Sequence, residues 1–129
     1  MTLLFVSTLI WLSFSSGNNV IAYKDNDENS TSSENPSGSY LTFEYTFDKT
    51  KEPADNIDAA RVNAFYIGNC VHDLFYRYGF TEVAFNFQNS NWTYGGKGGD
   101  RVKIRVQSVE SDDSGDPIKN NSYFQCPPE

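Results

Sequence analysis

The chain has 129 residues, an apolar fraction of 38% and a formal net charge of −7. This length suits one domain or part of a larger one, and an aromatic fraction of 16% is enough to build a packed core. The acidic balance and the lack of a basic cluster argue against binding to nucleic acid, whose phosphates select a basic face.

Residues 1–16 contain an apolar run at positions 3–14. The run is shorter than the roughly 20 residues that a membrane-spanning helix needs. Its length and the serines that follow are typical of a secretory signal peptide, although no basic residue precedes it. We therefore expect a secreted, extracellular protein with no stable membrane span. The alternatives for this segment are a buried strand or a spurious start.

Three Asn-x-Ser/Thr triplets are candidate glycosylation sites, which agrees with export: they start at Asn29, Asn91 and Asn120. The two cysteines, Cys70 and Cys126, match no zinc-binding spacing. They are either two buried thiols or, in a secreted chain, one disulfide.

The first half of the chain predicts one strand and much loop. Residues 18–23 form a short extended piece, and the polar residues 25–39 read as a surface loop. Residues 40–47 alternate apolar and polar side chains, the period of a half-buried strand.

Residues 56–78 predict a long amphipathic helix. Asp55 is the expected N-cap, and Gly79 is the expected stop because it is free to adopt positive φ. The apolar stripe is broad enough to pack against more than one partner, so we expect the isolated chain to be poorly stable. The stripe consists of Ile57, Ala60, Ala64, Ile67, Val71, Leu74 and Tyr78, widened by Phe65, Phe75 and Tyr76.

The only histidine, His72, lies on this helix and is followed by Asp73. A lone helical histidine beside an aspartate is more often a structural residue than a catalytic base, because catalysis needs further partners. A small hydrolase built on the pair is the alternative. Adjacent helical residues point about 100° apart, so the two side chains are not expected to face each other.

Beyond the helix the sequence predicts further sheet. Residues 80–88 are an aromatic extended segment, 89–99 a glycine-rich turn, 101–109 an alternating strand and 119–124 a short edge strand. The order of elements predicts an α+β fold with one central helix and too little sheet to cover it.

The order of motifs along the helix and its sequel resembles the fungalysin family of extracellular fungal zinc metalloendopeptidases. The resemblance covers about residues 17–128. It rests on these stretches: Gly17-Asn18-Asn19-Val20-Ile21-Ala22, Leu41-Thr42-Phe43-Glu44-Tyr45, Asn63-Ala64-Phe65-Tyr66, His72-Asp73, Tyr78-Gly79-Phe80-Thr81-Glu82, Asn86-Phe87-Gln88, Gly95-Gly96-Lys97-Gly98, Asp100-Arg101-Val102 and Asn120-Asn121.

The resemblance implies a thermolysin-like layout in which residues 17–129 are an incomplete, β-rich N-terminal subdomain with its long helix. In such enzymes an H-E-x-x-H helix and a later glutamate hold zinc, and the zinc-activated water cleaves peptide bonds of protein substrates. This chain contains no such motif, so we assign it no catalytic and no metal-binding residue. We expect it to be inactive alone and to pair with the C-terminal half of the domain.

Two positions carry further expectations from the resemblance. Asn121 and Ser122 stand where the family binds the substrate backbone along an edge strand, with an ordinary capped edge as the alternative. Phe85 stands where the family pattern leads us to expect glycine. His72, Asp73 and Gly79 are read as structural residues.

A non-catalytic function is the main alternative to a protease fragment. A secreted remnant of this kind would bind peptides, or the intact protease, through the edge strand that includes Asn121.

Overall fold

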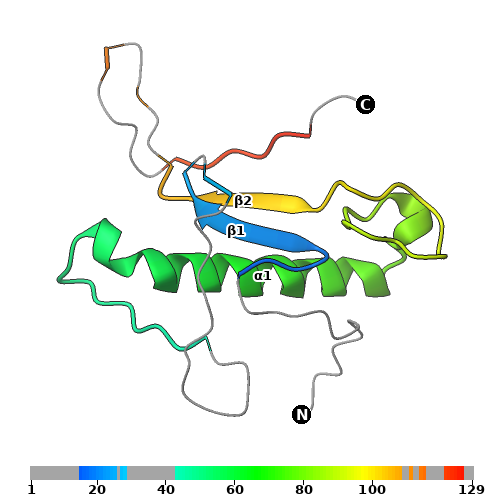
Figure 1. The fold of residues 1–129 in the computed structure, drawn as a ribbon, viewed down its shortest axis with the longest axis horizontal. Coiled ribbons are helices and arrows are strands. Elements are labelled where there is room, and N and C mark those ends of the chain that lie inside the picture. The colour runs from blue at the N-terminus through cyan, green and yellow to red at the C-terminus, as the bar shows by residue number, and fades with distance from the viewer. Residues whose placement is uncertain are drawn as a thin grey trace.

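The structure is a computed structural model that describes residues 15–25, 27–28, 43–108, 111, 114–115 and 121–126. One long helix packs on a small sheet, which is the α+β class that the sequence predicts (Figure 1). The elements in chain order are β1 (Val20–Lys24), the 3-10 turn η1 (Pro53–Asn56), α1 (Ile57–Arg77), the 3-10 turn η2 (Glu82–Ala84) and β2 (Val102–Val106).

The sheet is parallel. β1 pairs with β2 in a register that places Val20 opposite Val102 and Lys24 opposite Val106. Parallel neighbours need a long crossover, and α1 lies within the stretch that connects them. The other edge of β1 is covered by the chain before it, where the Ala22 amide donates to the Ser15 carbonyl at 2.9 Å.

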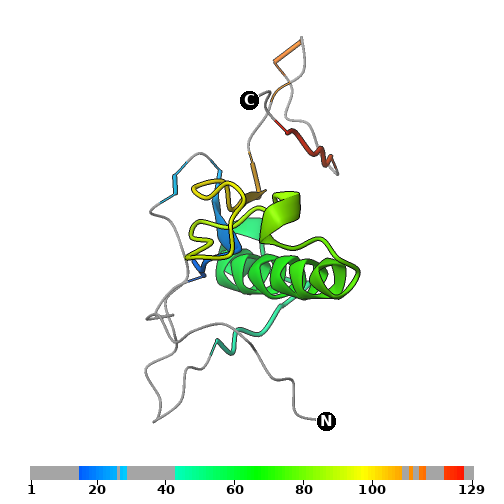
Figure 2. The same ribbon diagram turned by 90° about the vertical axis from the view of Figure 1, so that its right-hand side faces the viewer.

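The hydrophobic core lies between β1 and α1. Four consecutive residues of β1, Val20 to Tyr23, are buried, and α1 runs along one face of the sheet (Figure 2). The closest approach is at Gly68, where a Cβ atom would lie 2.9 Å from Ile104 Cδ1 and 3.1 Å from the Val20 methyl carbons. A residue without a side chain is therefore what lets the helix reach the sheet.

The two ends of α1 have different terminating structures. The N-cap is Asn56 rather than the predicted Asp55, which lies in η1 behind Pro53. The α-helix starts later than predicted because Asp55 belongs to the 3-10 turn that precedes it. The Asn56 side chain makes no capping hydrogen bond and donates instead to the Asp48 carbonyl at 2.9 Å. At the other end Gly79 has a φ of +95°, and the Phe80 amide donates to the Phe75 carbonyl. No helix in the described part of the chain is long and apolar enough to cross a membrane.

Three expectations about extended structure are wrong where the structure describes them. Residues 43–48 and 121–126 form no strand, and the segment after α1 contains the η2 turn. Alternation predicts a strand only where a neighbour can supply hydrogen bonds. Neither segment pairs with β1 or β2, the two strands of the described sheet. The strand predicted at 101–109 is present as β2.

Candidate functional site

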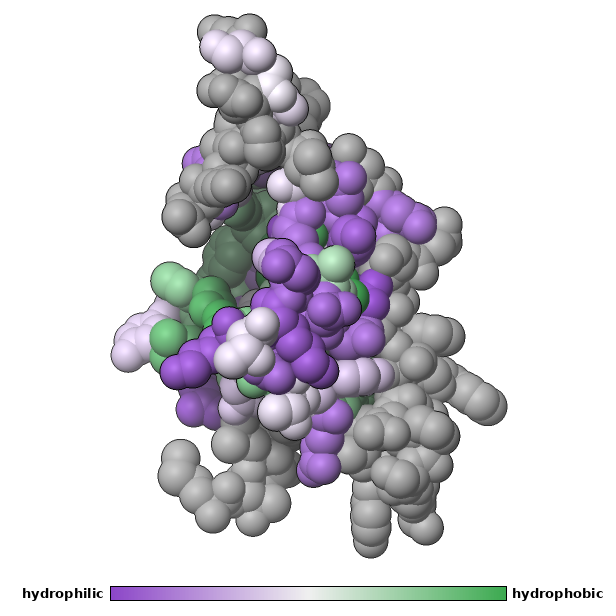
Figure 3. Space-filling view, turned by 90° about the vertical axis from the view of Figure 1, so that its left-hand side faces the viewer, coloured by the Kyte–Doolittle hydropathy of each residue, from purple (hydrophilic) through white to green (hydrophobic). Residues whose placement is uncertain are grey.

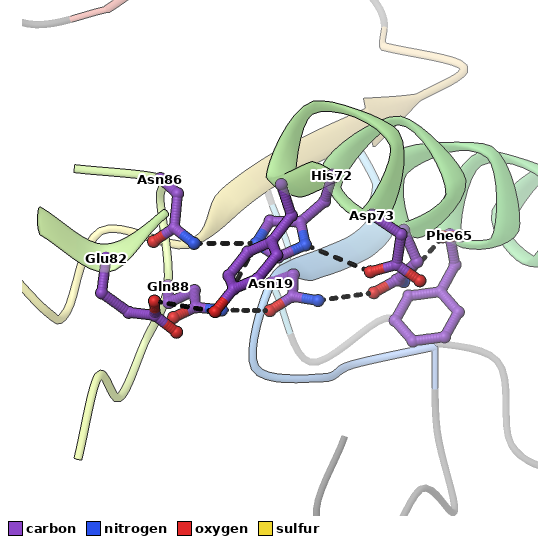
Figure 4. Close-up of polar contacts among 9 residues, drawn as sticks. Asn19, Phe65, His72, Asp73, Glu82, Asn86 and Gln88 are labelled. Atoms are coloured by element: carbon purple, nitrogen blue, oxygen red, sulfur yellow. Dashed lines mark hydrogen bonds and ion pairs between the residues drawn. The ribbon is translucent and has the colours of Figure 1, made fainter. Parts of the chain in front are cut away.

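Several polar side chains surround His72, whose side chain is only 9% exposed. We call His72, Asp73, Asn86, Gln88 and Asn19 the His72 cluster (Figure 4). α1 supplies the first two residues, the segment after η2 supplies Asn86 and Gln88, and the turn before β1 supplies Asn19. The cluster therefore joins three segments that are far apart in the sequence.

The imidazole ring of His72 has three polar neighbours. Its Nδ1 lies 3.3 Å from Asp73 Oδ1, and its Nε2 lies 3.4 Å from Asn86 Nδ2 and 3.3 Å from Gln88 Nε2. Nδ1 therefore faces a carboxylate oxygen and Nε2 faces two side-chain amide groups, so both ring nitrogens have a polar partner. These contacts correct the expectation that the His72 and Asp73 side chains do not face each other, because side-chain rotation brings them within reach.

A chain of amides extends the cluster across the fold. Gln88 Nε2 donates to Asn19 Oδ1 at 3.3 Å, Asn19 Nδ2 donates to Asn69 Oδ1 at 3.3 Å, and Asn69 Nδ2 donates to the Phe65 carbonyl at 2.8 Å. Two buried oxygens, Asn86 Oδ1 and Gln88 Oε1, have no hydrogen-bond partner among the described residues. Such a connected buried network selects one arrangement of the segments that it joins.

The same end of α1 is tied to η2 by Tyr76. Its hydroxyl donates to Glu82 Oε2 at 3.2 Å, and Glu82 is buried. Burial, followed by the charge of Glu82 and the hydrogen bond to it, raises the pKa of Tyr76 above its usual value. Elsewhere on α1, a hydrogen bond to the Cys70 thiol raises the pKa of Tyr66. Neither phenol is therefore prepared to act as a base.

The His72 cluster does not have the composition of a catalytic centre. Its members are amides and one carboxylate, and none of them is a Ser, Thr or Cys nucleophile beside the ring. Among the residues that the structure describes, no group of three or more His, Cys, Asp or Glu side chains could hold a metal ion. The contacts favour the structural role of His72 and Asp73, which stays a prediction.

The other candidate residues lie apart from this cluster. Asn121 and Ser122 are exposed, and no hydrogen bond between described residues joins either of them to His72. The neighbouring Tyr123 is held by Arg105, whose guanidinium donates to its hydroxyl and lies 5.9 Å above its ring.

The candidate modification sites differ in what the structure describes. Cys70 is half-buried and Cys126 is exposed, and both are free thiols in this structure, so the disulfide that the sequence left open stays a prediction. Asn29 and Asn120 lie outside the described residues. Asn91 is buried, and its Nδ2 donates to the Gly95 and Lys97 carbonyls, each at 2.9 Å.

Sequence reasoning did not identify Asn86, Gln88 and Asn19 as partners of His72. One indication was available in the sequence. Asn86 and Gln88 flank Phe87 in an otherwise aromatic segment, so two uncharged polar side chains point the same way from an apolar stretch. That pattern is typical of buried polar side chains that need a partner.

Comparison with known proteins identifies the chain's family. The family model described as Fungalysin metallopeptidase (M36) matches residues 8–129. The chain belongs to the fungalysin metallopeptidase family. The match begins inside the segment 1–16 that the sequence predicts to be a signal peptide. The comparison with solved structures gave no match.

Several curated relatives are extracellular metalloproteinases. Extracellular metalloproteinase 5 of Trichophyton tonsurans is 42% identical over 115 residues, which are 88% of this chain and 18% of the relative. The protein of the same name in Arthroderma benhamiae is 42% identical, and Extracellular metalloproteinase 1 of Arthroderma gypseum is 43% identical; each covers 88% of this chain and 17% of the relative. The chain thus spans less than a fifth of the length of these relatives.

Proposed function

We propose that this chain is part of the catalytic domain of a secreted zinc endopeptidase that cleaves peptide bonds in proteins. The observation that carries the proposal is the fungalysin match over residues 8–129. The relatives' names, extracellular metalloproteinases, support secretion and a protein substrate. In this proposal residues 17–129 supply the β-rich, N-terminal part of the domain with its long helix.

The residues present do not fit a zinc site. The single histidine of the chain is His72, and its two ring nitrogens face Asp73 and the amides of Asn86 and Gln88. A catalytic zinc needs three protein ligands and one open position. We therefore expect the chain alone to hydrolyse no peptide bond.

A protease assay tests this expectation. The purified chain is incubated with zinc and casein, and the Trichophyton tonsurans relative is assayed beside it as the positive control. We expect cleavage by the relative and none by this chain. Zinc-dependent casein cleavage by the chain alone, abolished by a chelator, would contradict the proposal that its own residues lack the catalytic centre.

The start of the folded domain is a second part of the proposal. Ser15 is buried, its hydroxyl donates to the Ala22 carbonyl at 2.9 Å, and Arg101 donates to Ser16 Oγ at 3.1 Å. A signal peptide ending at residue 16 would remove these contacts. We infer that any cleaved leader ends before Ser15, two residues earlier than the sequence predicts. N-terminal sequencing of the secreted protein tests this, and a mature start at Gly17 would contradict it.

A peptide-binding function is the second candidate. It is favoured by the exposure of the segment 121–126, in which Tyr123 and Phe124 are 57% and 77% exposed. The absence of a strand there counts against binding by a preformed edge. Asn121 would donate to the peptide backbone in this function, so Asn121→Ala should weaken the binding of casein-derived peptides while Asn89→Ala should not.

A further inference from the structure

Arg105 points away from α1, on the other face of the sheet. Its neighbour Ile104 points toward α1, since a Cβ atom on Gly68 would lie 2.9 Å from Ile104 Cδ1. Successive side chains of a strand point to opposite faces of the sheet, so Arg105 points away from the helix. The register of the sheet places Arg105 opposite Tyr23 of β1, which is 5% exposed. The half-buried Arg105 side chain therefore extends from the best-packed part of the fold.

The Arg105 guanidinium reaches a segment that belongs to no strand. Residues 121–126 are all exposed, and Tyr123 lies among them. Arg105 Nη2 donates a hydrogen bond to the Tyr123 hydroxyl, and Arg105 Cζ lies 5.9 Å from the centre of the Tyr123 ring. That distance is close to the outer limit of a cation–π contact, so the hydrogen bond is the main link between the two side chains.

Burial of apolar surface contributes little to holding this segment. Tyr123 and Phe124 are 57% and 77% exposed. In Figures 1 and 2 the segment lies beyond β2 from α1, outside the core between α1 and β1. Figure 3 shows that hydrophobic side chains gather along one side of the molecule, beside a mainly hydrophilic area. The polar contact with Arg105 is therefore a link that ties the segment to the sheet.

Tyr123 directly follows Asn121 and Ser122, the residues expected to bind a peptide backbone. Two residues of chain span at most about 7 Å, so fixing Tyr123 confines Asn121 to a small region beside β2. We propose that Arg105 is a positioning residue, which holds Tyr123 so that Asn121 and Ser122 are presented to the backbone of a peptide substrate. This inference rests on the proposed function and names a residue that orders its peptide-binding segment.

Holding the segment in place before a peptide arrives lowers the entropic cost of binding. A loosely held segment must be ordered when the peptide binds, and that cost weakens the affinity. A residue that acts in this way affects substrate binding and leaves the chemical step unchanged. We therefore expect loss of the Arg105 contact to raise KM while kcat stays constant.

A chimaera tests the contact in a complete enzyme. Residues 15–126 of this chain replace the aligned stretch of Extracellular metalloproteinase 5 from Trichophyton tonsurans, and KM and kcat are measured with a fluorogenic casein-derived peptide. Arg105→Met removes the donor and should raise KM about fivefold, with kcat changed by less than about twofold. Tyr123→Phe removes the acceptor and should have the same effect. The double variant should be no worse than either single variant, because both break one contact.

Two further variants separate positioning from a general loss of structure. Arg105→Lys keeps a donor on a long side chain and should restore most of the parent KM. Lys103→Met is the matched control, because Lys103 lies on the same strand and face but pairs with Glu28 at 2.7 Å. Both partners of that ion pair are about half exposed, so its loss should change KM by less than about twofold.

Each outcome decides one of the two proposals. An unchanged KM in Arg105→Met, a fall in kcat alone, or additive effects in the double variant would overturn the positioning role and leave the proposed function standing. A secreted parent chimaera without activity would overturn the proposed function and this inference with it.

Peptide binding by the full chain decides the matter if the chimaera is not secreted. Fluorescence anisotropy of a labelled casein-derived peptide should show about fivefold weaker binding to Arg105→Met than to the parent chain, and no such change in Lys103→Met. Equal affinities, or no binding by the parent chain, would overturn the inference.

Discussion

Phe85 is held in a backbone conformation that a phenylalanine disfavours. It has a φ of +60° and a ψ of +57°, in the left-handed region, directly after η2. A residue with a Cβ atom costs about 1–2 kcal/mol there, whereas glycine does not. This conformation gives a physical reason for the glycine that the family resemblance leads us to expect at this position.

Replacing Phe85 with glycine should stabilise the loop that follows η2. The side chain is 50% exposed, so little burial is lost, and we expect a net gain of about 0.5–1 kcal/mol after the added flexibility of the unfolded chain. Hydrogen exchange of the Asn89 amide, which donates to the Asn18 carbonyl, measures this as about two- to fivefold slower exchange.

Phe87→Gly is the matched control for this substitution. Phe87 also has positive φ, at +59°, but its ring packs edge-on against Phe80 with centroids 5.7 Å apart. In Phe87→Gly the relief of backbone strain is offset by the lost aromatic contact, so we expect no gain in the stability of the loop. Faster exchange of the Asn89 amide in Phe85→Gly than in the parent chain would show that the left-handed conformation of Phe85 does not destabilise the loop.

Asn91 should remain free of glycan in the folded protein, although its triplet is a glycosylation site by sequence. A glycan would be attached to Nδ2, and that nitrogen is buried and donates to the Gly95 and Lys97 carbonyls. Peptide mass spectrometry of the protein secreted from a fungal host measures occupancy. We expect none at Asn91, with Asn29 and Asn120 as internal comparisons. Complete occupancy at Asn91 would mean that this loop folds differently.

At the scale of elements, η2 and the glycine-rich loop depend on close backbone contact. A Cβ atom on Gly96 would lie 1.7 Å from the Glu82 carbonyl oxygen, whereas one on Gly99 would meet nothing within 4 Å. Both glycines have positive φ, at +69° and +84°. Comparing alanine substitutions at the two positions therefore distinguishes the destabilisation caused by a steric clash from that caused by the backbone conformation.

Gly96→Ala should open this loop, and Gly99→Ala should only weaken it. Left-handed alanine costs about 1–2 kcal/mol at either position, and the clash with η2 adds to this at Gly96. Exchange of the Asp100 amide, which donates to the Gln88 carbonyl and is present in both variants, should therefore be faster in Gly96→Ala than in Gly99→Ala by at least about tenfold. Equal effects would show that Gly96 does not pack against η2.

At the scale of the whole molecule, the described core is small for the surface that it leaves exposed. Its buried apolar residues are the four of β1, whereas large apolar side chains of α1 remain at the surface. Stability depends on the apolar area removed from water, and one strand pair on one helix removes little. The acidic charge of −7 adds weak repulsion within the compact state.

We therefore expect the isolated chain to melt without a sharp cooperative transition. Circular dichroism at 222 nm should fall gradually with temperature, and a dye that binds apolar surface should be bound before heating. A sharp two-state melt of the isolated chain would contradict this.

The sequence alone predicted the features that depend on local spacing. The long helix, the strand at residues 101–109 and the apolar stripe follow from periodicity, since side chains three or four residues apart share a helix face and alternate residues share a strand face. The family could also be recognised from the sequence, because a specific order of motifs along the chain is typical of it. The N-cap was displaced by one residue, since the 3-10 turn before α1 depends on what Asn56 contacts.

Only the tertiary structure decided which segments meet. The parallel pairing of β1 with β2, the absence of strands at 43–48 and 121–126, and the amides around His72 all join residues far apart in the sequence. Periodicity indicates which face of an element is apolar, but not which partner covers it. That choice depends on hydrogen bonds and packing that form together, because each buried polar group must find its partner in the folded chain.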